Sequence, residues 1–356
     1  MAAAILLSLA FSALAFDDGA RASAIYEPES GTFLFEKNAD ERRLIASTTK
    51  IMTALVIIEN CGLDEIVTVP KACESVPGTS LFLRGGSQYT VLELLYGILL
   101  ESANDAAYAL AIHCSGTIGS FAWLMNKRAE SIGMTNTHFE NPHGLDGAEH
   151  YSTAHDMALL AAEALKNPTF SLIVSTKTAK VMGRTFSNHN KLLWSVDGMI
   201  GVKNGYTQKA GRTLVTACTR NGMTLIYVTL SDPGDYTDHP AAYDWGFEGR
   251  KVFRTAAEGE TFASIEVVSG DRAEVGVVPT SQAAFLLNED EDITEEIYLP
   301  KFIYAPVEAG NYAGTIVYKK DGVEVFITDL VFETGAKAVQ PKRQGIFDRM
   351  FDFFSR

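Results

Sequence analysis

The chain has 356 residues, of which 47% are hydrophobic and 21% are charged, and its formal net charge is −14 at pH 7. This length and composition indicate a globular protein with one large domain and a smaller one. Because nucleic acids are bound chiefly by clustered Lys and Arg side chains, the acidic balance argues against a nucleic-acid partner.

The N-terminus, MAAAILLSLAFSALAFDDGA, is apolar or small from residue 2 to residue 15. This run is short for a membrane span. It ends in Ala13-Leu14-Ala15, the small-x-small pattern of a secretory cleavage site, although no basic residue precedes it. We therefore expect residues 1–15 to be a signal peptide and the protein to be exported. The alternative is a buried N-terminal helix.

Residues 23–36 are predicted to form two short strands joined through the turn Pro28-Glu29-Ser30-Gly31. The segment LIASTTKIMTALVIIEN then predicts an apolar helix that begins at Ser47 and ends near Cys61-Gly62. Further helical patterns follow at residues 90–113, 119–132 and 153–166.

From residue 198 the apolar pattern changes to that of strands, and Asn221-Gly222 between two β-rich runs predicts a hairpin. After about residue 255, short Val, Ile, Thr and Tyr runs alternate with turn residues up to Glu333, as in a small all-β domain. The predicted organisation is a mixed domain at 22–255, a β domain at 256–333 and a linker at 334–344.

The chain ends in GIFDRMFDFFSR, which predicts an amphipathic helix over residues 345–356. Residues 342–356 carry four basic and two acidic side chains, and six large apolar side chains share one side of a helical wheel: Ile346, Phe347, Met350, Phe351, Phe353 and Phe354. A short helix with an aromatic face and a net basic charge is suited to a membrane surface. The alternative is a helix that packs on its own domain or on a partner.

The start of the apolar helix is unusual because Lys50 directly precedes it, and burying a lysine is costly unless something compensates. Ser47 and Lys50 are spaced i and i+3, which places them on one face of a helical turn. A partly buried, neutral lysine can serve as the base that activates a serine, and the N–H groups of the turn suit an oxyanion. The alternative is a capping serine whose lysine reaches solvent.

Two more motifs follow. Ser102 and Asn104 form the chain's single S-x-N, in which the hydroxyl could relay a proton to a leaving amine while the carboxamide orients Lys50. The alternative is a pair that caps a helix start. Lys203-Asn204-Gly205 forms a K-x-G at the end of a predicted strand, for which a hairpin turn is the alternative. Lys320-Asp321-Gly322 fits the same pattern and is predicted to be a hairpin turn.

The order and spacing of the motifs are more specific than any one of them. S-x-x-K is followed by S-x-N after 55 residues and by K-x-G after about 100 more. In this the chain resembles the low-molecular-mass penicillin-binding proteins, the serine-type D-alanyl-D-alanine carboxypeptidases of bacterial cell walls, which belong to the β-lactamase/transpeptidase-like superfamily. The resemblance runs from about residue 22 to 255, including LLYGILLESANDAAYALA and NPHGLDGAEHYSTAHDMALLA, and the β-rich segment and the tail resemble the family's second domain and membrane anchor.

The resemblance implies an α/β (α+β) fold: a β-lactamase-like helical cluster on an antiparallel sheet, followed by a small all-β sandwich domain and a C-terminal amphipathic helix. It implies removal of the terminal D-alanine from peptidoglycan stem pentapeptides through an acyl-enzyme, without a cofactor, and covalent inhibition by β-lactam antibiotics. It also implies a secreted protein that is peripherally attached to the outer face of the cytoplasmic membrane.

Residue by residue, the resemblance makes Ser47 the nucleophile, Lys50 its base and Ser102 the proton relay. The N–H groups of Ser47 and Tyr206 would form the oxyanion hole. The substrate-binding positions implied are Asn104 for the amide, Lys203 and Asn204 for the terminal carboxylate, Gly205 for clearance along the strand, Tyr206, and Arg212 as a second carboxylate contact or a surface arginine.

One position departs from the family, which usually has Thr where this chain has Asn204. An Asn amide can donate the same hydrogen bond, but it is longer. A catalytically weak peptidoglycan-binding or scaffolding protein of the same fold is therefore an alternative. A β-lactamase is disfavoured because that function needs neither the β domain nor an anchor.

The histidines and the cysteines could in principle serve as metal ligands or form disulfides. The histidines at 138, 143, 150 and 155 suggest a zinc peptidase, but no H-E-x-x-H is present and their spacing fits no pair of ligands on a helix face, so no metal is expected. The four cysteines include no C-x-x-C, which favours buried thiols over a bridge: Cys61, Cys73, Cys114 and Cys218.

Overall fold

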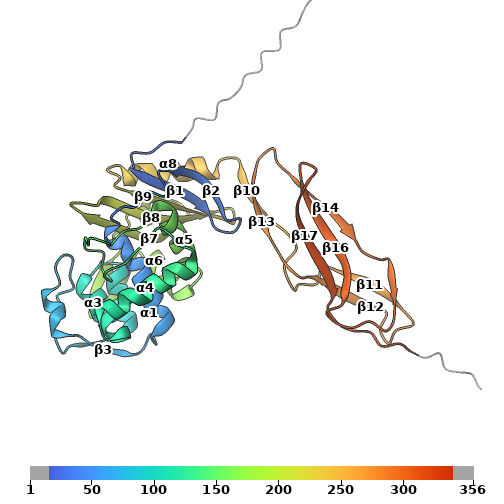
Figure 1. Ribbon diagram of the computed structural model, residues 1–356, viewed down its shortest axis with the longest axis horizontal. Coiled ribbons are helices and arrows are strands. Elements are labelled where there is room, and N and C mark those ends of the chain that lie inside the picture. Colours follow the sequence, from blue (N-terminus) through green and yellow to red (C-terminus); the bar gives the residue numbers. More distant parts are fainter. Residues whose placement is uncertain (1–15, 340–356) are drawn as a thin grey trace, which may run out of the picture. The chain divides into compact units, whose positions relative to one another are not determined.

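The computed structural model describes residues 16–339, and their contacts divide the chain into two units between Gly249 and Arg250. The first unit combines helices with an antiparallel sheet and the second is built from strands (Figure 1), which confirms the predicted fold class. The predicted signal peptide at 1–15 and the predicted amphipathic helix at 345–356 lie outside the described residues.

The sheet of the first unit has five antiparallel strands in the order β2-β1-β9-β8-β7. Its strands are β1 (Ala22–Glu27), β2 (Thr32–Lys37), β7 (Met199–Thr207), β8 (Gly211–Arg220) and β9 (Met223–Leu230). Both predicted hairpins of this unit are confirmed. In the β8–β9 turn, Asn221 and Gly222 have φ of 50° and 75°, the left-handed pair that a type I′ turn requires.

Helices cover both faces of this sheet: α8 packs on β8 and β9, whereas α5 and α6 pack on the opposite face (Figure 1). The helices are α1 (Lys50–Asn60), α2 (Val91–Leu99), α3 (Asn104–Ser115), α4 (Ile118–Ile132), α5 (Ala154–Leu165), α6 (Pro168–Ser175), α7 (Leu192–Ser195) and α8 (Asp235–Phe247). Helix α1 lies at the centre of the cluster, and its residues from Lys50 to Ile57 are all buried. Taken singly, no helix among residues 16–339 combines the length and apolar character of a membrane span.

The prediction of one continuous helix over residues 90–113 was wrong. The structure ends α2 at Leu99 and begins α3 at Asn104, because Ser102 adopts a left-handed conformation with φ of 60°. The break turns the backbone so that the Asn104 N–H bonds to the carbonyl of Thr79 at 2.7 Å. The S-x-N motif therefore lies at a helix start, as its alternative interpretation proposed, although the N-cap residue is Ala103 and no side chain caps the helix.

Short elements complete the first unit, and none of them was predicted. They are the 3₁₀ turns η1 (Ala46–Thr49) and η2 (Lys71–Ser75), the hairpin strands β3 (Ile66–Thr68) and β4 (Gln88–Thr90), and the hairpin strands β5 (Thr178–Val181) and β6 (Arg184–Ser187). Helices α6, α7 and α8 were also not predicted. Turn η1 matters most, because it carries Ser47 into the start of α1.

The second unit contains a six-stranded sheet in the order β14-β16-β17-β12-β11-β15 and a separate pair, β10 with β13. The strands are β10 (Arg250–Arg254), β11 (Ala263–Val268), β12 (Glu274–Pro279), β13 (Ala284–Asn288), β14 (Ile293–Tyr298), β15 (Phe302–Tyr304), β16 (Tyr312–Lys320) and β17 (Val323–Phe332). The turn predicted at Lys320-Asp321-Gly322 is confirmed between β16 and β17. Residues 334–339, placed in the linker by the sequence, instead contact this unit through the bridges of Ala336 with Val307 and Ala338 with Gly270.

Candidate active site

Ser47 and Lys50 are brought together by the join between η1 and α1. The Nζ atom of Lys50 lies 2.9 Å from the Oγ atom of Ser47. The same Nζ lies 2.8 Å from Oδ1 of Asn104, at the start of α3, and 2.7 Å from the backbone carbonyl of His143. Lys50 is fully buried, so three segments of the chain meet at one amine that solvent does not reach.

The three contacts of Lys50 match a neutral amine. Neutral lysine has two N–H donors, which the two carbonyl oxygens of Asn104 and His143 accept, and one lone pair, which can accept the Ser47 hydroxyl proton. None of the three partners is a carboxylate. Burial, and then the positive charge of Lys203, lower the pKa of Lys50 well below its ordinary value, against a smaller opposing effect of Asp105. The geometry and the electrostatics therefore both favour a base beside Ser47.

Asn104 is fixed from its other side. Its Nδ2 donates to the Pro77 carbonyl at 2.7 Å, so the amide is held with Oδ1 toward Lys50. The neighbouring Asp105 accepts hydrogen bonds from the backbone N–H groups of Leu81 and Leu83, both at 3.0 Å. These bonds tie the 77–83 loop to the start of α3 and make that wall of the site rigid.

Two glycines allow backbone segments to approach the nucleophile closely. Gly205 lies in β7, and a Cβ atom there would come within 2.7 Å of the Ser47 backbone nitrogen. Gly144 has φ of 85°, and a Cβ atom there would overlap the carbonyl of Ala46. Because β7 is an edge strand, half of its peptide groups point away from β8. An oxyanion formed at Ser47 can therefore reach N–H groups of both η1 and β7.

The K-x-G motif lies inside β7 and not in a turn. Lys203, Asn204 and Gly205 pair with Val215, Leu214 and Thr213 of β8, so the turn interpretation of this motif was wrong. Lys203 is buried, and its Nζ donates to the backbone carbonyl of Asn204 at 2.8 Å and to Oδ1 of Asn204 at 3.1 Å. Burial lowers the pKa of Lys203 to about 7.

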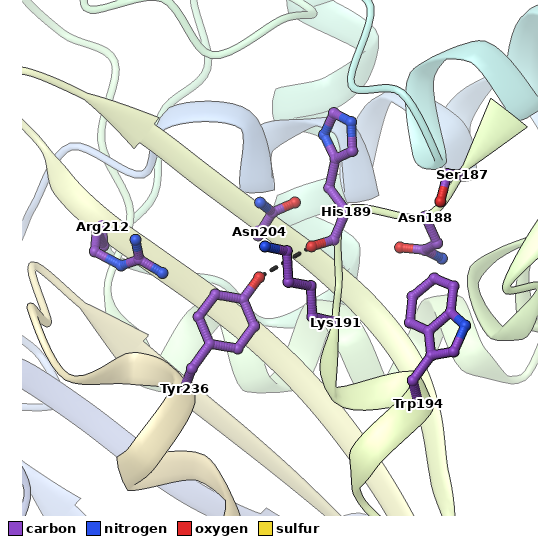
Figure 2. Close-up of a pocket in the computed structure, with 8 residues that line it drawn as sticks. All are labelled: Ser187, Asn188, His189, Lys191, Trp194, Asn204, Arg212 and Tyr236. Atoms are coloured by element: carbon purple, nitrogen blue, oxygen red, sulfur yellow. Dashed lines mark hydrogen bonds between the residues drawn. The ribbon is translucent and has the colours of Figure 1, made fainter.

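A pocket of about 670 Å³ opens beside this strand. Figure 2 shows Arg212 and Tyr236 on one side of it, with Asn204 at its centre. Arg212 donates to Oδ1 of Asp235 at 2.7 and 2.9 Å and lies over the Tyr236 ring at 5.2 Å. The other lining residues are Ser187, Asn188, His189, Lys191 and Trp194. The cations and amide donors of this lining suit a ligand that carries a carboxylate.

Sequence comparison gives the family. Residues 11–234 match the family model described as D-alanyl-D-alanine carboxypeptidase, and residues 247–337 match the model of the C-terminal domain of penicillin-binding protein 5. The chain belongs to the D-alanyl-D-alanine carboxypeptidase family.

Individual relatives agree over most of the chain. The D-alanyl-D-alanine carboxypeptidase DacF of Bacillus subtilis is 33% identical and the alignment covers 89% of this chain and 88% of the relative. DacC of Escherichia coli is 32% identical, with 94% and 87% covered. The crystal structure of penicillin-binding protein 5 from Haemophilus influenzae gives a TM-score of 0.74 at 28% identity, over 90% of this chain and 98% of that one. The protein is a low-molecular-mass penicillin-binding protein and a serine-type carboxypeptidase.

The carboxypeptidase fold brings Ser47, Lys50 and Asn104 into direct contact and places Gly205 against Ser47. Ser102 lies two residues before Asn104, is 6% exposed and makes no hydrogen bond with its side chain within residues 16–339. The remaining predicted residues lie along or beside β7: Lys203, Asn204, Tyr206 with a side chain 65% exposed, and Arg212 opposite Tyr206 on β8.

Sequence reasoning missed one backbone group of the site, the carbonyl that accepts a hydrogen bond from Lys50. The carbonyl of His143 is a partner of Lys50, yet a carbonyl leaves no signal in residue type. The residues that hold the site, Asp105 and Asp235, were missed as well. Asp105 directly follows Asn104 in the sequence and could have been considered with the S-x-N motif.

The four histidines of residues 138–155 have structural partners in this carboxypeptidase. His150 uses both ring nitrogens, on Thr49 Oγ1 at 2.8 Å and on the Glu140 N–H at 3.1 Å. His138 contacts the Glu149 carbonyl at 2.7 Å, and the ring of His155 stacks on Phe33. Burial lowers the pKa of His143 to about 3 and that of His150 to about 4, so both are neutral at pH 7.

Proposed function

We propose that this carboxypeptidase removes the terminal D-alanine from peptidoglycan stem pentapeptides through an acyl-enzyme on Ser47, and that penicillin acylates the same residue. The contact of 2.9 Å between Lys50 Nζ and Ser47 Oγ, at an amine with no carboxylate partner, is the observation that carries this proposal. Family membership supports the same chemistry.

In the first half of the reaction, Ser47 Oγ attacks the carbonyl carbon of the penultimate D-alanine while Lys50 takes up the hydroxyl proton. The oxyanion accepts hydrogen bonds from the N–H groups of Ser47 and Tyr206. Ser102 then passes its hydroxyl proton to the amide nitrogen and takes up the proton held by Lys50, so that Lys50 is neutral again; the C–N bond breaks, and D-alanine leaves as the free amino acid. Water attacks the remaining ester, with Lys50 as base, and frees Ser47.

The enzyme selects its substrates by binding their terminal carboxylate. Lys203 supplies positive charge from within β7, and Arg212 supplies a second cation at the pocket, held in place by Asp235. Asn204, which follows Lys203 in β7, lines the same pocket as Arg212. Because Oδ1 of Asn204 already accepts from Lys203, its Nδ2 is the group that donates to the carboxylate.

The activity is tested by two measurements on one sample: covalent labelling with fluorescent penicillin, and release of D-alanine from diacetyl-L-Lys-D-Ala-D-Ala. We expect both. Labelling without release of D-alanine would support the catalytically weak binding or scaffolding protein instead.

Replacement of Asn204 tests the carboxylate contact. We expect Asn204→Ala to lower kcat/KM for D-Ala-D-Ala peptides at least about tenfold, which corresponds to roughly 1.4 kcal/mol and is within the range for a hydrogen bond to a charged group. Asn204→Thr should keep or raise activity, because it restores a hydroxyl donor where the family usually has threonine. An Asn204→Ala enzyme that matches the wild type would leave recognition to Lys203 or Arg212.

We also propose that the protein is exported and attached to the outer face of the cytoplasmic membrane through its C-terminal helix. The sequence features of residues 1–15 and 345–356 support this proposal.

Deletion of residues 344–356 tests the anchor. We expect the wild type to sediment with anionic vesicles and the truncated protein to stay in solution, because the apolar face is lost together with basic residues worth about 1 kcal/mol each near the surface. Activity on a soluble peptide should be unchanged. Continued sedimentation of the truncated protein would exclude the tail as the anchor.

A further inference from the structure

A cluster of three different metal-ligand types lies at the ends of two helices, outside the candidate active site. Cys61 directly follows α1, Glu65 precedes β3, and His113 is in the last turn of α3. The Cys61 sulfur, a carboxylate oxygen of Glu65 and a ring nitrogen of His113 all lie within 4.8 Å of one another. Over residues 16–339, no other group of three or more His, Cys, Asp or Glu side chains meets that criterion.

The residues that carry the metal-ligand atoms of this cluster are already held in position. Oε1 of Glu65 accepts from the Gly62 N–H at 2.7 Å, and Oε2 of Glu65 lies 2.9 Å from Nε2 of His113. Cys61 is fixed by its backbone, whose N–H bonds to the Ile57 carbonyl at 2.9 Å. A metal ion would therefore replace the contact between His113 and Glu65 without requiring the chain to refold.

The ligand chemistry points to zinc. A thiolate, an imidazole and a carboxylate suit Zn²⁺, whereas Ca²⁺ and Mg²⁺ prefer oxygen ligands alone. We propose that Cys61, Glu65 and His113 bind one zinc ion. The fourth position of a tetrahedral site is filled by water.

The position of this zinc site gives it a structural role. Helices α1 and α3 begin with Lys50 and Asn104, which share a hydrogen bond of 2.8 Å. At their other ends, Cys61 directly follows α1 and His113 lies in the last turn of α3. Since α1 has 11 residues, the ion would lie about 16 Å from the reacting groups, measured along the helix at ~1.5 Å per residue. It would join the far ends of the two helices whose near ends form the base and its partner. This role is independent of the proposed function, because the zinc takes no part in the reaction.

Zinc binding is tested on the full chain, kept in a non-thiol reductant and freed of metal with a chelator. We expect calorimetry to find one zinc ion per chain and Co²⁺ to give a thiolate-to-metal charge-transfer band. Cys61→Ser should abolish that band. His113→Gln and Glu65→Gln should weaken zinc binding by more than the roughly 10- to 100-fold that removal of an outer-shell partner costs. The matched control is His138→Gln, a histidine outside the cluster, which should bind zinc as the wild type does.

A second measurement separates ligand loss from misfolding. Zinc should raise the Tm of the wild type and of His138→Gln but not that of Cys61→Ser, since a ligand stabilises only the state that binds it. Cobalt without a charge-transfer band, or zinc binding that survives Cys61→Ser, would overturn the site. So would binding that needs Cys61 and Cys114 but neither His113 nor Glu65. A Cys61–Cys114 disulfide in protein isolated without reductant, with no zinc bound, would also overturn it.

Discussion

The Ser47→Ala protein should take up no covalent penicillin and should release no D-alanine. The change removes one oxygen atom, the one that lies 2.9 Å from Lys50 Nζ, and leaves no other hydroxyl bonded to that amine. Loss of a serine nucleophile lowers kcat by about 10⁶-fold in a well-studied serine protease, and we expect a loss of that order here. Mass spectrometry of the protein after incubation with penicillin measures the adduct directly.

The matched control for this substitution is Ser131→Ala, at an exposed serine on α4. It removes the same atom and should label at the wild-type rate. An adduct on the Ser47→Ala protein would place the nucleophile elsewhere and would reject the mechanism, provided that circular dichroism shows the variant to be folded.

Replacement of Lys50 should have the next largest effect. Lys50→Arg keeps the positive charge but cannot supply a base, because a guanidinium does not lose its proton in proteins. Lys50→Met removes both charge and base. General-base catalysis contributes about 10²- to 10⁴-fold, so both variants should acylate more slowly by at least that factor. The time course of labelling by fluorescent penicillin measures the rate.

The pH dependence gives an independent check on Lys50. Its pKa is lowered by burial and by Lys203, and only the neutral amine accepts a proton. Acylation by the wild type should therefore fall as the pH drops through the pKa of Lys50, and this acid limb should be absent from the residual activity of Lys50→Met. Lys127→Met, an exposed lysine paired with Glu130, is the control and should keep the wild-type profile. A Lys50→Arg enzyme with the wild-type rate would exclude Lys50 as the base.

The sequence predicted the elements that are specified by neighbouring residues, such as tight turns. The hairpin turns at Asn221-Gly222 and Asp321-Gly322 were predicted because left-handed backbone leaves a signature in residue type. The break between α2 and α3 was foreseen only as an alternative, a helix start at the S-x-N motif. Ser102 is a non-glycine residue in that same left-handed conformation, and the segments on both sides continue a helical pattern. Local propensity there was overridden by tertiary contacts such as that of Asn104 with Thr79.

The candidate site was predictable where side chains form ordered motifs. Ser47 and Lys50 were predicted from their spacing at the start of an apolar helix together with the order of the three motifs, which also predicted that Asn104 orients Lys50. The cluster of Cys61, Glu65 and His113 was not predictable, because His113 lies 48 residues from Glu65 in the sequence and only the packing of α3 beside the 61–65 turn brings them together. The pairing of Arg212 with Asp235 depends in the same way on the packing of α8 against β8.

The two buried lysines make the strength of the base depend on whether substrate is present. In the free enzyme the charge of Lys203 acts against protonation of Lys50, so Lys50 is a weak proton acceptor and Ser47 stays a hydroxyl. When a substrate carboxylate pairs with Lys203, that repulsion is offset and the proton affinity of Lys50 rises. In the proposed reaction, the base is thus strengthened when a chain end that carries a carboxylate arrives at Lys203, and we expect the unoccupied enzyme to hold no reactive alkoxide that water or another carbonyl compound could consume.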